Sequence, residues 1–201
     1  MGTNLQLLID ENKKPMPTGY QQGILLALGS QLGDKFGVRC IDRWYPDHVQ
    51  PIFGTKVYAI ADWHKPGRKQ YIVKSVSVSA PHIDDVVDWC GFCRAWLEIH
   101  GGIKPVTRKR RKTRELYHVP GFRIYGKEHI LQAIMYHLPI QPRKILEIKG
   151  ITEKKYEGKT YCISIQSPAD VFATLEYIDG LPRNERIWDE WALKLSKLTN
   201  S

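Results

Sequence analysis

Two short stretches of the chain combine small residues, a side chain that can take part in chemistry and a basic segment close behind. The first, ALGSQLGDK (27–35), carries Asp34, and the second, FCRAWLEIHGGI (92–103), carries Glu98 and His100. Carboxylate oxygens are the ligands that hard cations such as Mg²⁺ prefer, whereas imidazole serves as a general base or binds softer metals. Each stretch therefore carries a side chain that could take part in binding a ligand or in chemistry.

The second stretch leads directly into the most basic segment of the chain. Its Lys and Arg side chains are Lys104, Arg108, Lys109, Arg110, Arg111, Lys112 and Arg114. If this segment belongs to a β-hairpin, strand alternation sends some of these side chains to each face. One face could then contact base edges while the tip and the other face contact phosphates. A solvated run of charge, or a nuclear-localisation-like patch, is the alternative.

A smaller group of cations lies in the first half of the chain, interleaved with aromatic residues. The cations are Lys65, Arg68, Lys69 and Lys74. The aromatic residues are Tyr58, Trp63 and Tyr71. These rings could stack on unpaired bases, as in RNA-binding proteins, or could pack on neighbouring strands as ordinary sheet residues.

The overall composition is that of a globular protein with a polyanionic partner. The chain has 201 residues, 42% of them hydrophobic, and a formal net charge of +9. Such an excess favours DNA, RNA or an acidic membrane surface as partner. No apolar run is long enough to cross a bilayer, and the start lacks the pattern of a signal peptide. We therefore expect a cytoplasmic (bacterial or phage) or organellar protein that is not secreted.

The four cysteines do not suggest a disulfide framework or a zinc site. They are Cys40, Cys90, Cys93 and Cys162. A chain of this size without a secretion signal seldom depends on disulfides. The Cys90-x-x-Cys93 pair lacks the second pair that a zinc site needs. Buried, reduced thiols are the better interpretation.

Apolar periodicity and turn residues predict an alternation of helices and strand pairs. Helices are expected at residues 19–34, from Asp84 and Asp85 to about His100, at 127–138, from Pro168 onward and at 186–198. Strands are expected at residues 38–44, 56–63, 70–79, 103–113 and 115–125, and within 143–152 and 159–167. The sequence HKPGRK, at residues 64–69, joins two of these strands as a hairpin turn.

This order of elements indicates an internal repeat. The later part of the chain runs helix, two strands, helix, two strands, helix, and the earlier part begins in the same way but is shorter. We therefore divide the chain into an N-terminal arm (1–18), a shortened first half (19–89) and a complete second half with a C-terminal helix (90–201).

The two stretches described first resemble the paired signature helices of the LAGLIDADG homing endonucleases and the related intron maturases. The resemblance extends through residues 90–180, and in the first half it is limited to the helix. It implies an α+β fold of two αββαββα halves, whose antiparallel sheets form a saddle over DNA. It also implies that the signature helices pack side by side and that each ends in an acid holding a divalent metal. Relatives include maturases that bind intron RNA and regulators that do not cut.

Small residues in both helices fit a close helix contact. Gly29 and Gly33 are four residues apart, as are Gly91 and Ala95, so each pair lies on one face of a helix. The resemblance implies that these two faces meet. The alternative is that the small residues merely fit a crowded core.

The expected metal centre departs from the family pattern. The resemblance places Asp34 at the first acid position, as catalytic residue and metal ligand, and His100 at the second. It gives Glu98 a supporting role. A neutral imidazole is a poorer ligand for Mg²⁺ than a carboxylate. His100 could therefore mark a protein that binds without cutting, one that nicks through Asp34 alone, or one in which His100 is a general base or ligates a softer metal. It could also simply cap the helix C-terminus.

From the sequence, we expect a nucleic-acid-binding protein, maturase-like or regulatory, with a degenerate metal centre. The alternative is an active homing endonuclease or nickase that uses Mg²⁺. A third possibility is an unrelated α+β protein whose basic hairpin docks on ribosomal RNA. The partner would be DNA or structured RNA. The protein would be a monomer with a pseudo-twofold axis or a homodimer.

Overall fold

The computed structural model describes residues 16–62, 64–148 and 160–181 and the single positions 183, 189 and 193. For residues 103–105 and 117–120 it describes the backbone alone. Most of the expected N-terminal arm and of the expected helix at 186–198 therefore lies outside the described residues.

The described part of the chain is an α+β fold, as expected. The first half contains α1 (Gly19–Leu28), β1 (Gly29–Leu32), β2 (Lys35–Cys40), α2 (Trp44–Phe53), β3 (Tyr58–Ala61), β4 (Lys69–Ser75) and the 3-10 turn η1 (Ile83–Asp85). The second half contains α3 (Trp89–His100), β5 (Gly101–Lys109), β6 (Leu116–Gly126), α4 (Glu128–His137), β7 (Ile145–Glu147), β8 (Tyr161–Ile165) and α5 (Pro168–Ile178).

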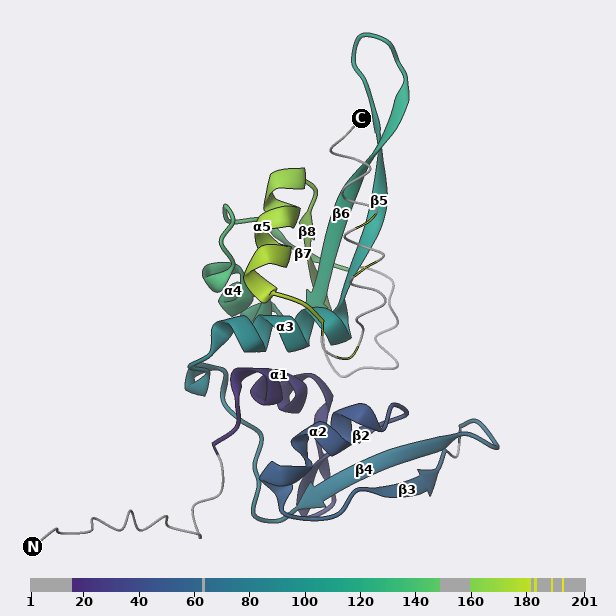
Figure 1. Ribbon diagram of the computed structural model, residues 1–201, viewed down its shortest axis with the longest axis vertical. Coiled ribbons are helices and arrows are strands. Elements are labelled where there is room, and N and C mark those ends of the chain that lie inside the picture. The colour runs from purple at the N-terminus through teal and green to yellow at the C-terminus, as the bar shows by residue number, and fades with distance from the viewer. Residues whose placement is uncertain are drawn as a thin grey trace, which may run out of the picture.

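Each half builds one four-stranded antiparallel sheet, and the two sheets have the same strand order. The orders are β1-β2-β4-β3 and β5-β6-β8-β7. The registers also correspond, because Gly29 lies opposite Val38 in the first sheet and Gly101 lies opposite Ile124 in the second. Helices α1 and α3 lie side by side between the sheets, one sheet beyond each helix (Figure 1). The internal repeat is therefore present in the fold.

The first half is more complete than the sequence indicated. It lacks only a counterpart of α5, since residues 76–88 hold no regular element apart from η1. Helix α2 was missed, and the strand expected at 38–44 was wrong beyond Cys40. The prolines of α2 explain the error: Pro46 lies in the first turn, where proline is tolerated, and Pro51 lies two residues before the end.

The two central helices begin and end at different residues from those expected. Helix α1 was expected to reach Asp34, but it ends at Leu28, because Gly29 takes an extended conformation and pairs with β2. Helix α3 begins at Trp89, where the Asp88 side chain accepts a hydrogen bond of 2.9 Å from the Gly91 N–H. Such a cap sets the first turn of a helix. The two acids expected in that turn lie in η1 instead.

The hydrophobic cores of the two halves interlock through α1 and α3. Ala95, from α3, is fully buried in the core of the first half, and Ile99 packs against the same core. In the opposite direction, Leu26 and Ala27, from α1, pack against the core of the second half. Each half therefore needs residues of the other to complete its core.

Small residues make this close helix contact possible. A Cβ atom added to Gly23 would lie 2.6 Å from the Cβ atom of Ala95, and one added to Gly91 would lie 2.8 Å from the backbone nitrogen of Tyr20. On α1 the expected contact residues were wrong. Gly29 packs against the Phe36 ring of its own half, and Gly33 lies in the β1–β2 turn with a φ of +70°. Gly91 and Ala95 do lie at the contact.

All four cysteines are free thiols, Cys93 and Cys162 buried and the other two half-buried. Within the described ranges, no helix is both long and apolar enough to cross a membrane.

We predict that Gly23→Ala destabilises the protein although alanine is the better helix former. Helix propensity alone would favour alanine by about 1 kcal/mol. The clash with Ala95 should outweigh this and lower the free energy of unfolding by about 1–3 kcal/mol, a usual cost of overpacking. Chemical denaturation measures the change. The matched control is Gly102→Ala, since a Cβ at Gly102 meets no atom within 4 Å. Equal stabilities of the two variants would contradict the close contact.

Candidate nucleic-acid interface and the helix ends behind it

The C-terminal ends of α1 and α3 occupy equivalent positions in the repeat. Each helix passes without a loop into a strand, at Gly29 and at Gly101. Each of these glycines is extended and donates its N–H to the carbonyl oxygen four residues earlier, of Leu25 or Leu97. The last helical residues, Leu28 and His100, are therefore the structural counterparts of each other.

His100 connects its own helix end to that of α1. Its imidazole hydrogen-bonds with the backbone of Ala27, and its ring centroid lies 4.9 Å from that of Trp96. Burial lowers the pKa of His100 and the Ala27 contact raises it, with a net shift below the ordinary value. The environment therefore favours the neutral ring. His100 therefore makes a contact between the two helix ends, in surroundings that disfavour its cationic form.

The C-terminal end of α1 ends in Leu28, a side chain that cannot bind a metal ion. Leu28 is a hydrocarbon that packs against the core of the first half. Asp34, which was expected at this position, lies beyond β1 in an exposed turn. Since β1 has four residues, it carries the chain about 13 Å from the helix end at about 3.3 Å per residue. Because Gly29 and Gly101 occupy equivalent places in the two sheets, Leu28 lies at the position where the resemblance places the first acid.

Glu98 holds the two helices together. One carboxylate oxygen accepts a hydrogen bond from the Tyr20 hydroxyl of α1, and the other accepts one of 2.7 Å from the backbone N–H of Arg183. Burial and this contact raise the pKa of Tyr20 well above its usual range, so the hydroxyl stays protonated and donates. The side chain of Arg183 continues the connection to Asp42 of the first half, at 2.6 Å. These contacts agree with a supporting role for Glu98.

The described residues do not fit the expected Mg²⁺ centre. A magnesium site is built from carboxylate and carbonyl oxygens and water. Here one helix ends in an imidazole and the other in an aliphatic side chain. The described residues contain no group of three or more His, Cys, Asp or Glu side chains that could hold a metal ion. We therefore derive no hydrolytic step through a metal ion.

In the described part of the chain, the helices pack against one face of each sheet, and the other face, here called the open face, is turned away from them. Val38 and Ile124 are fully buried on the helix side. Because neighbouring residues of a strand point to opposite faces, Arg39 and Arg123 belong to the open faces. Cross-strand partners share a face, so Lys74, opposite Gly37, also lies on the open face of the first sheet.

Most of the predicted binding cations of the second half lie on the β5–β6 hairpin. In β5, Lys104 lies opposite Gly121, and Arg108 donates hydrogen bonds to the carbonyl oxygen of Gln166 at 3.2 Å and to its side-chain oxygen at 3.4 Å. The hairpin projects well away from the helix pair (Figure 1). Its exposed cations are Lys109, Arg110, Arg111, Lys112 and Arg114. The basic segment is thus a ribbon with a cationic tip.

The tip of this hairpin is an ordered turn. The Arg110 N–H donates to the carbonyl oxygen of Glu115 at 2.9 Å, and their side chains lie 3.7 Å apart. Arg114 has a φ of 64° and donates its N–H to the Arg110 carbonyl oxygen at 3.0 Å. That conformation favours glycine, and an arginine there costs free energy. A charged side chain therefore stands where local conformation alone would select glycine.

One of the four predicted cations of the first half is committed to an internal partner. The guanidinium of Arg68 pairs with Asp62, whose side chain is buried. Burial would raise the pKa of Asp62, but hydrogen bonds from Arg68 and from the His64 N–H lower it below the ordinary value. Lys65 and Lys69 are exposed at the same hairpin.

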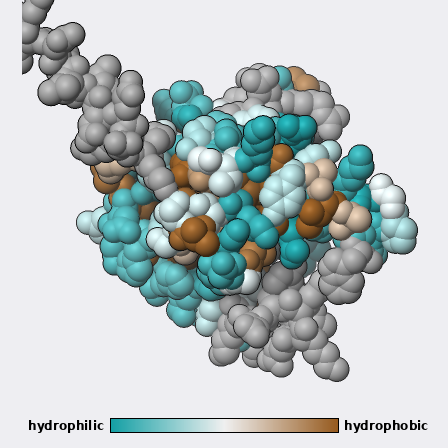
Figure 2. Space-filling model, turned by 90° about the horizontal axis from the view of Figure 1, so that it is seen from below, coloured by the Kyte–Doolittle hydropathy of each residue, from teal (hydrophilic) through white to brown (hydrophobic). Residues whose placement is uncertain are grey.

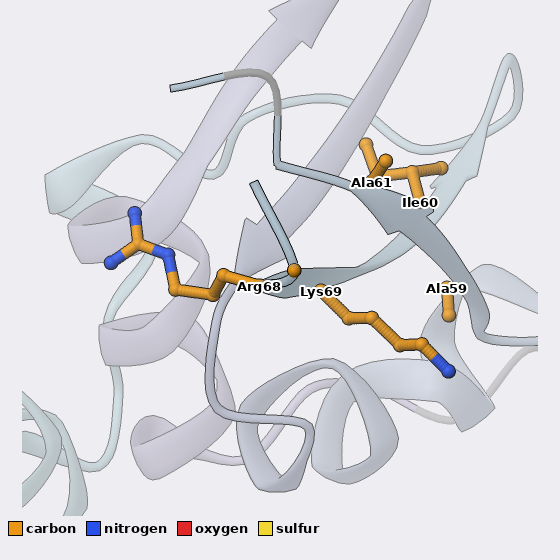
Figure 3. A pocket seen from close by; sticks show the side chains of 6 residues that line it. Ala59, Ile60, Ala61, Arg68 and Lys69 are labelled. Carbon is orange, nitrogen blue, oxygen red and sulfur yellow. The ribbon is translucent and has the colours of Figure 1, made fainter. Parts of the chain in front are cut away.

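This hairpin also holds a shallow hollow of about 340 Å³. Its lining residues are Ala59, Ile60, Ala61, Gly67, Arg68 and Lys69. In Figure 3 the side chains of Arg68 and Lys69 point to opposite sides of β4 and do not converge on one ligand. The hollow is therefore no phosphate site built by both cations.

The aromatic residues of the first sheet divide between its two faces. Tyr58 is 41% exposed and pairs with Ile72 on the open face. Tyr71 pairs with Cys40 on the helix side, and the Arg43 guanidinium lies 5.8 Å from its ring centroid. Trp63 lies outside the described residues. Base stacking thus remains a prediction for Tyr58, whereas Tyr71 packs as a sheet residue.

Comparison with known proteins gives the fold. No family model matches the sequence. No curated protein matches it either. Solved structures do match: I-LtrWI bound to its target DNA has a TM-score of 0.65 at 8% identity, covering 91% of this chain and 90% of that chain. I-SmaMI bound to cleaved DNA has a TM-score of 0.63 at 9% identity, covering 94% and 92%.

A structure of I-SmaMI bound to its uncleaved DNA target in the presence of calcium ions also matches. Its TM-score is 0.63 at 9% identity, covering 92% of each chain. I-SmaMI is described as a LAGLIDADG homing endonuclease, and so is I-LtrWI. This chain therefore has the fold of the LAGLIDADG homing endonucleases, which confirms the resemblance. At such identities the likeness concerns the fold alone.

The sequence contained a signal that would have placed the first helix correctly. Gly23 and Gly29 are six residues apart, as are Ala95 and Gly101. Matching these pairs gives Leu28 as the partner of His100. The Gly33–Asp34 dipeptide is closer to the family motif, and it led to a predicted helix end six residues beyond the observed one.

We predict that His100 makes the protein less stable in mild acid. The pKa of His100 is lowered on folding, so below about pH 6.5 the unfolded chain binds more protons than the folded one. Stability is therefore fully present above that pH and falls as the pH decreases. His100→Gln, which keeps a donor for Ala27, should lose less of its melting temperature between pH 7.5 and 5.5 than the wild type. The control is His129→Gln, on the exposed side of α4. The same pH dependence in the wild type and in His100→Gln would contradict the assignment.

Proposed function

We propose that this chain binds duplex DNA with the open faces of its two sheets and does not cut it. The observation that carries the proposal is the pair of residues at the helix ends, Leu28 and His100. A metal-dependent hydrolase on this scaffold needs carboxylates there, and a hydrocarbon cannot hold a hard cation. The fold is retained together with its basic hairpin, which supports binding as the remaining activity.

DNA is favoured over RNA by the shape of the hairpin and by the relatives. Strands β5 and β6 form a two-stranded ribbon, and the major groove of B-DNA admits such a ribbon. The major groove of A-form RNA is too narrow for side chains to read. The similar I-SmaMI and I-LtrWI structures are bound to DNA. The net charge of +9 supplies the general attraction to a polyanion.

The surface also supports a polar partner. In the view of Figure 2, hydrophobic residues form separate spots among hydrophilic ones. Large exposed apolar side chains such as Ile41, Val76 and Val87 come from different segments. Scattered apolar residues are normal on a soluble surface and do not by themselves indicate a protein partner.

We predict that the protein leaves supercoiled plasmid intact in the presence of Mg²⁺ or Mn²⁺. I-SmaMI on its own target serves as the positive control for the assay. Nicked or linear plasmid that appears in proportion to the protein, and persists after repurification, would show that the alternative of a nickase or endonuclease is correct.

In the same preparation we expect a mobility shift with a 30-base-pair duplex. Affinity should fall by roughly three orders of magnitude between 50 and 200 mM salt, as for proteins that make several phosphate contacts. A structured intron RNA is the competing probe. Tighter binding to the RNA than to the duplex would replace the proposed function with a maturase-like one.

A further inference from the structure

We propose that the two halves contribute unequally to DNA binding: the second half makes most of the phosphate contacts through its β5–β6 hairpin, and the first half, whose equivalent hairpin is β1–β2, makes few. This inference rests on the proposed function and adds to it an unequal division of work between the two halves. It follows from the length, the charge and the backbone conformation of the two hairpins.

The two hairpins differ in reach although they occupy equivalent places in the repeat. Strand β5 has nine residues and β1 has four. At about 3.3 Å per residue, β5 extends about 30 Å from the helix end and β1 about 13 Å. The longer ribbon can follow a groove well past the centre of the protein, whereas the shorter one ends close to the centre.

The turns of the two hairpins differ in charge. The β5–β6 tip exposes four cations between residues 110 and 114, with Glu115 as the one acid beside them. The β1–β2 turn consists of Gly33 and Asp34, and Lys35 follows it. A carboxylate at this turn repels a phosphate backbone. The residue first expected to hold a metal therefore reduces the attraction of the first hairpin for DNA.

The central parts of the two open faces are comparable, so the difference arises in the hairpins. By register, Arg39 and Lys74 of the first sheet correspond to Tyr125 and Ser164 of the second. Conversely, Gly37 corresponds to Arg123. Each open face therefore carries cations at some positions where the other open face has a neutral residue.

The backbone of the tip supports a binding role for its charges. Arg114 keeps a left-handed conformation that glycine would adopt at lower cost. Strain of this kind is typical of positions where a side chain is needed for function. Two backbone hydrogen bonds order the turn that carries these exposed cations.

The test compares three variants that each remove three positive charges and so have the same net charge. The tip variant is Arg111→Gln, Lys112→Gln and Arg114→Gln. The first-half variant is Lys35→Gln, Lys65→Gln and Lys69→Gln. The charge control is Lys56→Gln, Lys127→Gln and Lys144→Gln, at exposed positions outside both sheets. For each protein, the dissociation constant for a 30-base-pair duplex is measured from 50 to 300 mM salt.

We expect the tip variant to lower the slope of log affinity against log salt by about 2 to 3, at about 0.9 for each lost phosphate contact. The first-half variant should lower it by less than 1, and the charge control should leave it unchanged. Equal changes in the tip and first-half variants, or no change in the tip variant, would overturn the unequal contribution of the two halves while leaving DNA binding in place. A wild type that does not bind the duplex would instead overturn the proposed function, and this inference with it.

Arg114→Gly provides a variant that cannot lose binding through misfolding of the tip. Glycine relieves the left-handed backbone, so the melting temperature should stay equal or rise. The salt slope should still fall by about 1. A full wild-type slope in this variant would show that Arg114 does not touch phosphate, and would count against the inference.

Discussion

The structure depends on the close approach of α1 and α3. Gly23 and Ala95 meet at a separation that no larger side chain allows. The two helices reach across the contact, each supplying apolar side chains to the core of the opposite half. Glu98 adds a polar connection, through Tyr20 of the first half and the backbone of Arg183. The relative position of the two sheets is therefore set by one helix pair.

The same contact brings together the C-terminal ends of α1 and α3. His100 hydrogen-bonds with the backbone of Ala27, and Leu28 packs against the core of the first half. His100 thus connects α3 to α1, and Leu28 connects α1 to the core of its own half. The two helix ends are thus part of the packing that supports the sheets.

The second half was predictable because its local signals agree with its tertiary structure. The apolar spacing of α4, the proline at the start of α5 and the basic hairpin each correspond to an observed element. In the first half, local signals misled. Two prolines concealed α2, and the motif-like Gly33–Asp34 dipeptide drew the helix end away from Gly29. What decides that end is the pairing of Gly29 with Val38, a contact between segments that sequence periodicity does not report.

The pairing of Arg68 with Asp62 shows a second limit of sequence reasoning. The basic residue was counted among the predicted nucleic-acid contacts, yet it closes the β3–β4 hairpin on a buried carboxylate. The sequence shows that Arg68 is cationic, but it does not show that Arg68 forms an ion pair with Asp62 inside the protein.

The exchange of side chains between the two cores has a consequence for how the chain can be divided. A fragment that begins near residue 89 would keep its own sheet and its covering helices α4 and α5, yet it would expose the apolar surface of α3 that α1 now covers. The small side chains at Gly91 and Ala95 would allow a second copy of the fragment to dock there. Truncation at the repeat boundary would therefore produce a self-associating species instead of an autonomous monomer.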